Sequence, residues 1–135
     1  MSIKKSSIFV IAVIVIVTLL TVINNGDNTM QINMGDHSMT FSGIDDFTHE
    51  LAYDDIISAE LVLDPDWESL GGQEFGSFRV GQVSNAQGEQ YTLFVTTQAD
   101  CAVVTALADG SQMIFNYNST GNTESIYEML LKNIQ

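Results

Sequence analysis

The pattern of apolar and polar positions divides the chain into an apolar run near the N-terminus and a longer part in which the two kinds alternate. Residues 8–23 read IFVIAVIVIVTLLTVI, with no charged side chain. With Ser6 and Ser7 the uncharged run reaches eighteen residues, enough for a helix to cross the hydrocarbon core of a bilayer. The pattern predicts a transmembrane anchor at 8–23, after a short N-terminus at 1–7 and before a polar tether at 24–28.

The flanking charges predict how this anchor is oriented. Lys4 and Lys5 precede it, and no further basic residue occurs before Arg79. By the positive-inside rule, residues 1–7 lie in the cytoplasm and everything after the anchor lies outside. Residues 24–27 (NNGD) offer no small-x-small cleavage site, so an uncleaved anchor is favoured over a cleaved signal peptide.

The number of cysteines indicates in which cellular compartment the protein is located. Cys101 is the single cysteine, which excludes an internal disulfide framework and any site with several cysteine ligands. An exported chain without disulfides is typical of a bacterial envelope protein. The predicted location is therefore the bacterial cytoplasmic membrane, with a single span and the C-terminal domain outside.

Beyond the tether, residues 29–135 have the pattern of one mainly-β domain. Residues 30–34 and 39–41 alternate around Gly35-Asp36 and predict a hairpin. Further strands are expected at 56–63, 78–83, 91–96, 101–104 and 112–117. Asp109-Gly110 predicts a two-residue type I′ hairpin turn. Residues 47–53 are ambiguous between a helical turn and an irregular connection, and the longest loop is expected from Asp64 to Gly76.

Near the C-terminus the period of the pattern changes from strand to helix. From Thr123 the apolar residues fall on one helical face: Ile126, Tyr127, Leu130, Leu131 and Ile134. Asn122 or Thr123 is the predicted N-cap. About seven short strands followed by one amphipathic helix predict a small barrel or sandwich that the helix closes at one end.

Five pieces of this pattern also carry a family resemblance. They are residues 53–61, the end of a glycine-rich loop at 76–78, the strand at 91–95, the hairpin at 108–116 and the helix at 123–134. Together they resemble the small bacterial PH (pleckstrin-homology-like) domains found on membrane-anchored proteins of Gram-positive bacteria. The resemblance implies a PH-like barrel with a C-terminal capping helix, and it implies no catalytic residues.

The resemblance does not imply lipid binding in this chain. Lipid-binding PH domains hold phosphoinositides with Lys and Arg side chains around the first strand pair. The corresponding turn here, Met34 to His37, contains neither residue type. Because an acidic turn cannot neutralise a phosphate cluster, we expect no phosphoinositide binding.

The net charge excludes further partners. The chain has 17 acidic and 4 basic residues, a formal net charge of −13. Beyond the anchor only Arg79 and Lys132 oppose the 17 acids, so that part carries −15. Such a domain repels nucleic acid and anionic headgroups. The charge serves solubility, or it attracts a basic partner or divalent cations.

The sequence contains few candidate catalytic or metal-binding residues. His37 and His49 are the two histidines, and neither has partners at a spacing typical of a metal or catalytic site. Cys101 begins an apolar strand with no basic residue nearby to lower its pKa, so it is interpreted as a small buried hydrophobe. The sequence therefore predicts no catalytic residue, no metal site and no cofactor.

The acidic residues of the long loop give an alternative hypothesis. Asp64, Asp66 and Glu68 alternate as in a calcium loop, but the sixth and twelfth positions hold Ser69 and Phe75. An EF-hand needs Gly and Glu there. A weak, irregular cation site remains as the alternative, which would make the protein an acidic cation-responsive envelope module.

The same loop holds the candidate interaction surface, formed by Trp67, Glu68 and Glu74. Trp67 is either an exposed anchor for a partner or a lid over the barrel. The main hypothesis from the sequence is a non-enzymatic, membrane-anchored interaction module that binds an envelope protein.

Overall fold

The computed structural model describes residues 28–134. The predicted anchor (8–23), the N-terminus (1–7) and residues 24–27 of the tether lie outside them. The strands are β1 (Gln31–Met34), β2 (Ser38–Ser42), β3 (His49–Ala52), β4 (Ile56–Leu63), β5 (Gln73–Phe75), β6 (Phe78–Ser84), β7 (Gln90–Thr96), β8 (Cys101–Leu107) and β9 (Gln112–Phe115). The helices are the 3-10 turn η1 (Tyr53–Asp55), the single turn α2 (Trp67–Leu70) and the C-terminal α3 (Thr120–Ile134).

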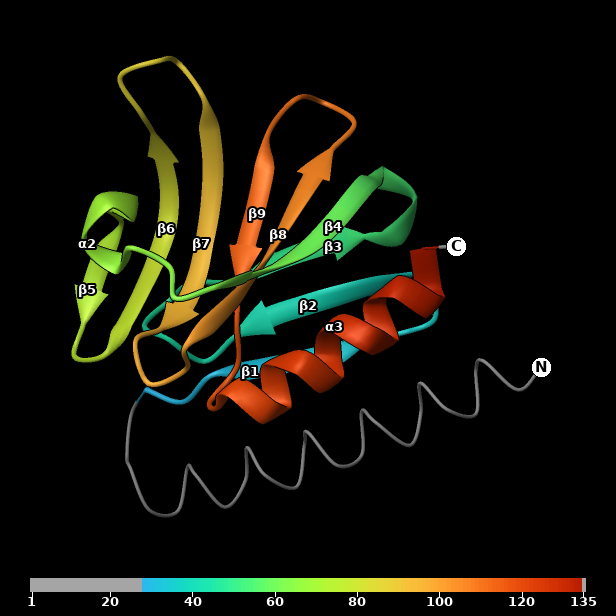
Figure 1. Cartoon of the computed structure of the whole chain (residues 1–135), viewed down its shortest axis with the longest axis horizontal. Coiled ribbons are helices and arrows are strands. Elements are labelled where there is room, and N and C mark those ends of the chain that lie inside the picture. Colours follow the sequence, from blue (N-terminus) through green and yellow to red (C-terminus); the bar gives the residue numbers. More distant parts are fainter. Residues whose placement is uncertain (1–27, 135) are drawn as a thin grey trace.

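The strands form two sheets. β1, β2 and β3 make a three-stranded antiparallel sheet, and the remaining strands make a six-stranded sheet in the order β4-β8-β9-β7-β6-β5 (Figure 1). Neighbours in the large sheet are antiparallel except for β7 and β9, which pair in parallel. The expectation of a mainly-β domain with a C-terminal helix is therefore confirmed, with nine strands in the described residues instead of about seven.

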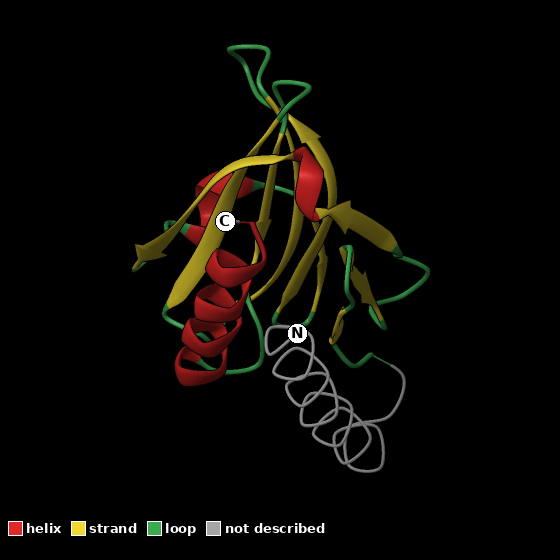
Figure 2. Cartoon of the chain, turned by 90° about the vertical axis from the view of Figure 1, so that its right-hand side faces the viewer, coloured by secondary structure: helices red, strands yellow, loops and turns green. Residues whose placement is uncertain are grey.

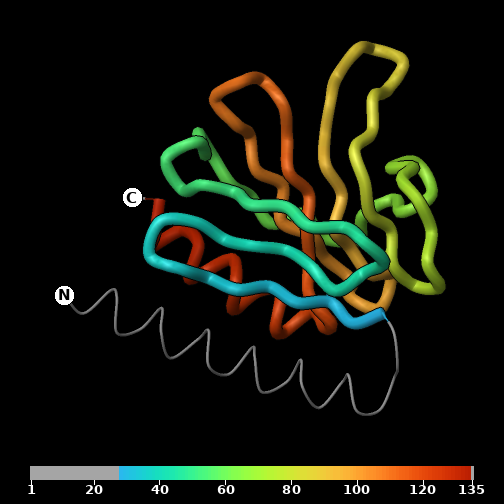
Figure 3. Tube along the Cα trace, turned by 180° about the vertical axis from the view of Figure 1, so that it is seen from behind, coloured from blue at the N-terminus to red at the C-terminus, as the bar shows by residue number. Residues whose placement is uncertain are grey.

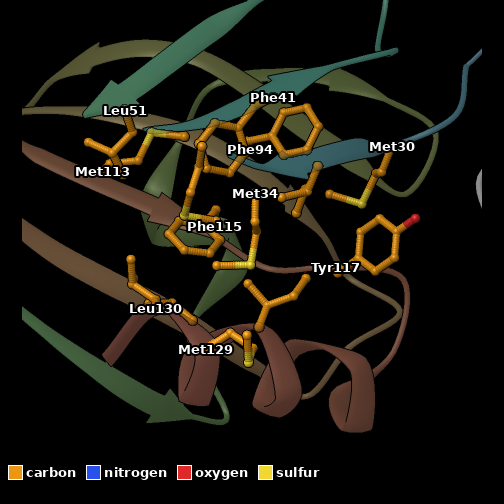
Figure 4. Close-up of a cluster of buried hydrophobic side chains, with 14 of the residues drawn as sticks. Met30, Met34, Phe41, Leu51, Phe94, Met113, Phe115, Tyr117, Met129 and Leu130 are labelled. Carbon is orange, nitrogen blue, oxygen red and sulfur yellow. The ribbon is translucent and has the colours of Figure 1, made fainter. Parts of the chain in front are cut away.

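The small sheet covers one face of the large sheet, which we call the inner face (Figure 3). α3 packs against η1, β4 and β8, and its buried residues belong to the same core as those of the small sheet; Figure 2 shows the helix beside the strands of the large sheet. The main core forms between these three layers (Figure 4). At its centre the Phe41 ring lies 5.3 Å from that of Phe94 and 5.0 Å from that of Phe115.

The two strands that the sequence did not predict have weak patterns. β3 pairs with β2 over its whole length, but of its residues only Leu51 is fully buried, between Glu50 and Ala52. β5 is three residues long and lies at the edge of the large sheet, where no residue is fully buried. Alternation marks a strand only where one face is buried, so neither segment shows it.

The C-terminal helix begins earlier than predicted, and its cap is a different residue. α3 starts at Thr120, and the Ser119 hydroxyl accepts a hydrogen bond from the Asn122 amide at 3.1 Å, as an N-cap does. Thr123 is buried, and its hydroxyl accepts the Tyr117 amide at 2.9 Å. The prediction of Asn122 or Thr123 as the cap was wrong because the helix starts at Thr120, and the side chain of Thr123 instead ties the helix to the segment after β9.

The turn at Asp109-Gly110 joins β8 to β9 as predicted, but its type is different. Gly110 has a φ of +91°, whereas Asp109 has no positive φ, as a type I′ turn would require. The Gly110 amide donates to the Leu107 carbonyl at 3.0 Å, and the Leu107 amide to the Ser111 carbonyl at 2.9 Å. This is a three-residue loop with a glycine bulge.

β9 lies between β7 and β8, which follow each other directly in the chain. We call the place where β7 and β8 separate the fork, and the side chain of Asn116 lies there. Its side-chain oxygen accepts the Thr96 amide at 2.7 Å. Its side-chain nitrogen donates to the carbonyls of Thr96 at 2.9 Å and Cys101 at 3.1 Å. Asn116 is fully buried, so one amide replaces the ladder bonds that β7 and β8 lose where they separate.

Candidate functional site

The face of the large sheet that points away from the small sheet, the outer face, has an apolar cluster of its own. Successive strand residues point to opposite faces, so Leu93 and Val95 lie on the outer face while Phe94 enters the main core. We call this set the outer cluster: Tyr91, Leu93, Val95, Ala102 and Ile114. No second sheet covers it in the described residues.

Residues 64–72, here called the strap, cover the outer cluster. The strap leaves β4 and crosses the large sheet to α2, beside β5 and β6 (Figure 1). Its first residue is held by a hydrogen bond from the Asp64 amide to the Asp100 carbonyl at 2.8 Å. Near its end, the Tyr91 hydroxyl donates to the Leu70 carbonyl at 2.7 Å. A phenol at the edge of the outer cluster therefore fixes the strap over it.

A glycine lets the end of the strap approach the sheet closely. Gly72 has a φ of +82°, and a Cβ placed there would lie 2.9 Å from a methyl carbon of Leu93. Any other residue at this position would be strained by the positive φ, and its Cβ would also clash with the methyl carbon of Leu93. From the sequence the glycines of the loop were interpreted as a flexible connection; for Gly72 the structure shows that the close approach to Leu93 requires a glycine.

The structure places the three predicted interaction residues at or next to the strap. Trp67 is half-buried and packs on the outer cluster, as a lid does, whereas Glu68 is exposed. Glu74, in β5, pairs with Arg79 at 3.0 Å. Arg79 is the register partner of Val95, so Glu74 and Arg79 project from the outer face too. Trp67 and Glu74 therefore share this face.

The acidic residues of the strap do not converge on a common point. Asp64, Asp66 and Glu68 are all exposed. Among residues 28–134, no three His, Cys, Asp or Glu side chains lie close enough together to hold a metal ion. The part of the chain that the structure describes thus offers no observation in favour of the cation hypothesis.

The histidines and the cysteine lie in separate parts of the fold. His37 is exposed in the β1–β2 turn. His49 lies in β3 with its ring stacked on Phe47, and partial burial lowers its pKa below the usual 6.5. Cys101 is buried in β8, and burial and the nearby Glu124 raise the pKa of its thiol. A thiol with a raised pKa is a poor nucleophile.

Two clefts were not foreseen from the sequence, because segments far apart in the chain form each of them. The first, the hairpin cleft, has a volume of about 430 Å³ and lies between β3 and the tips of the β6–β7 and β8–β9 hairpins. Its carboxylates are Glu50, Asp55 and Asp109. Glu50 accepts a hydrogen bond from the Ser38 hydroxyl at 2.9 Å. Asp109 accepts two from Ser111, which lower the pKa of Asp109.

The second cleft, the base cleft, has a volume of about 420 Å³. It lies where the described chain begins, between the start of β1, the β5–β6 turn, the end of β7 and the segment after β9. Its described lining contains no ionisable acid or base apart from the phenol of Tyr117. The two clefts are thus similar in size, but the hairpin cleft is lined by carboxylates and the described lining of the base cleft is uncharged.

Comparison of the chain with protein-family models, with curated protein sequences and with solved structures gave no match. Within residues 28–134, no helix combines the length and apolarity needed to cross a bilayer. The geometry of the described residues, together with the sequence, therefore carries the functional argument.

Proposed function

We propose that the protein is a non-enzymatic, membrane-anchored, extracytoplasmic PH-like domain that binds a basic envelope protein through the strap face. The strap face is defined as Trp67 and Glu68 of the strap with Glu74 and Arg79 beside it. The observation that carries the proposal is the covering of the outer cluster: a strap of nine residues with a half-buried Trp lies over it.

The chemistry of the strap face suits a protein partner. Trp combines a large apolar area with an indole N–H donor and is enriched among residues that dominate binding energy. Its neighbours along the strap include the exposed carboxylates Asp64, Asp66 and Glu68. Complementary charge speeds association and selects the partner, so a basic surface is the expected counterpart.

Two further parts of the proposal rest on the sequence. The anchor and its orientation derive from the apolar run at 8–23 and from Lys4 and Lys5. The PH-like type is supported by the strand-rich pieces that resemble that family and by the C-terminal helix. The parallel pairing of β7 with β9 departs from a barrel built only of antiparallel neighbours.

The proposal is tested by crosslinking in living bacterial cells. A photo-reactive amino acid replaces Glu68, which is exposed, in the full-length chain, and captured proteins are identified by mass spectrometry. One recurrent basic envelope protein is expected. In the double variant Trp67→Ala and Glu74→Ala its capture should fall several-fold. The matched control carries the photo-reactive residue at Gln87, exposed on the β6–β7 hairpin tip.

Equal capture by the double variant and by the unmodified strap face would show that the surface is wrongly assigned. Orientation is tested separately by adding protease to intact cells, since the proposed topology requires cleavage of the domain from outside. The alternative, a cation-responsive module, requires a higher melting temperature in millimolar calcium.

A further inference from the structure

The base cleft differs from the rest of the surface in its lack of charge. The chain has 17 acidic residues, yet none lies among the described residues that line this cleft. Those residues are Asn28, Thr29, Met30, Phe75, Gly76, Ser77, Phe78, Thr96, Gln98, Tyr117 and Asn118. Its volume of about 420 Å³ falls within the range of small-molecule sites, about 300–1,000 Å³.

The polar groups of the base cleft can both donate and accept hydrogen bonds. Asn28, Gln98 and Asn118 contribute carboxamides, and Ser77 contributes a hydroxyl. Each carboxamide has two N–H donors and an acceptor oxygen with two lone pairs, and one lone pair is already used in Asn28, by the Asp45 amide, and in Asn118, by the Asn122 side chain. Such groups match ligands that carry both hydroxyl donors and acceptors, and they leave an ionic ligand without a counter-charge.

Apolar and aromatic residues form the other part of the lining. Phe75 and Phe78 are partly buried at the β5–β6 turn, and both pack against the main core. They form a fixed apolar wall, because β5 and β6 pair through these two residues. An aromatic wall opposite carboxamides suits a pyranose, which has an apolar ring face and a polar rim.

One residue of the lining is short of a partner. Thr29 is only 3% exposed, and its hydroxyl has no hydrogen-bond partner among the described residues. A buried hydroxyl without a partner destabilises the protein, and most buried polar groups are paired. In the hairpin cleft, by contrast, Glu50 and Asp109 are bonded by serines. The Thr29 hydroxyl is itself buried, so it lies beneath the lining of the base cleft and is not a contact for a ligand.

We propose that the base cleft binds an uncharged saccharide, with the ring against Phe75 and Phe78 and the hydroxyl or acetamido groups on the carboxamides. This site is separate from the strap face, since the two share no residue, so either proposal can fail without the other.

The test is saturation-transfer NMR with the full-length chain, in a detergent without a sugar headgroup if one is needed. The probes are four sugars with the same ring: N-acetylglucosamine and glucose, which are neutral, glucosamine, a cation, and glucuronate, an anion. We expect transfer to the two neutral sugars, with N-acetylglucosamine binding about tenfold more tightly than glucuronate, a difference equivalent to about 1.4 kcal/mol.

Two variants at one position locate the site. Gln98 is exposed, and only its backbone amide is bonded, to the Thr96 hydroxyl at 3.2 Å, so changing its side chain leaves the fold intact. Gln98→Ala and Gln98→Glu should each weaken N-acetylglucosamine binding about fivefold to tenfold. Gln87→Glu makes the same change on the β6–β7 hairpin tip and should leave binding unaltered.

Three results would overturn the proposal. The first is no transfer to either neutral sugar. The second is equal binding of the charged and neutral sugars. The third is binding that survives Gln98→Glu but is lost in Trp67→Ala, which would move the sugar site to the strap face.

Discussion

The two faces of the large sheet are buried in different ways. The inner face packs against a second sheet and a helix, and the rings of Phe94 and Phe115 both contact Phe41 of that second sheet. The outer face buries five residues under a strap whose one helical turn has no fully buried residue. The inner face therefore holds most of the stability, while the outer face has a cover that can be displaced at lower cost.

The largest expected effect compares the two faces directly. Phe115→Ala in the main core should lower the free energy of unfolding by about 3–5 kcal/mol, and Leu93→Ala in the outer cluster by about 2 kcal/mol, at the low end for Leu→Ala. The strap can settle into the space that Leu93 leaves, whereas the two sheets cannot. Urea unfolding of the full chain measures both values. Equal losses would show that the outer face is packed as tightly as the inner one.

A second test concerns Asn116, which bonds β7 and β8 where they separate at the end of the large sheet. Both faces of the sheet are formed by these strands. Asn116→Ala leaves the Thr96 amide and carbonyl buried without their partner, so we expect a loss of about 2–3 kcal/mol. Asn118→Ala is the matched control, because the side chain of Asn118 bonds only Asn122, in an exposed position. It should cost less than about 0.5 kcal/mol. A similar loss in both variants would rule out the role of Asn116 in the fork.

A third test addresses the attachment of the strap. Tyr91→Phe removes the hydrogen bond to Leu70 and should lower the free energy of unfolding by about 1 kcal/mol. Proteolysis within residues 64–72 should become faster, while hydrogen exchange in β8 should change little. Tyr127→Phe on α3 provides the same substitution away from the strap. Unchanged proteolysis in Tyr91→Phe would mean that apolar contacts alone hold the strap.

The smallest expected effect is a pH dependence of the stability, and it is caused by His49 in the small sheet on the inner side. Burial lowers the pKa of His49 below 6.5 in the folded protein, so the unfolded chain binds the proton more readily. The contribution of neutral His49 is therefore present above pH 6.5 and is lost as the pH falls below it. The urea midpoint of unfolding should therefore vary less with pH between about pH 5 and 7 in His49→Gln than in the unmodified protein. His37→Gln, in the exposed turn, should leave this pH dependence unchanged. An unaltered profile in His49→Gln would contradict this assignment.

Much of the secondary structure followed from the sequence because it depends on local alternation. β4, β6 and β7 were predicted almost to the residue, since buried and exposed positions or Pro65 mark their limits. β3 and β5 were missed because neither has an alternating pattern of fully buried residues. The parallel pairing of β7 with β9 was missed for another reason: it joins segments that no local signal relates.

The candidate site was predictable only in part. Trp67, Glu68 and Glu74 were selected from the loop, and the structure places Trp67 and Glu74 on one face. Nothing in the sequence indicated that Tyr91 fixes the strap, because its hydrogen bond to Leu70 spans 21 residues. The base cleft was equally inaccessible, since its lining comes from four separate segments that meet only in three dimensions.

The position of β9 also constrains the order in which the sheet can assemble. β7 and β8 emerge from the ribosome before β9, and the four residues that join them are few enough for a direct hairpin. Such a hairpin would occupy the place of β9 and would have to open before β9 could insert, so it is a kinetic trap. We expect slow refolding for a domain of this size. A chain truncated after Ser111 would retain β7 and β8 with unpaired edges, which is the condition that favours aggregation.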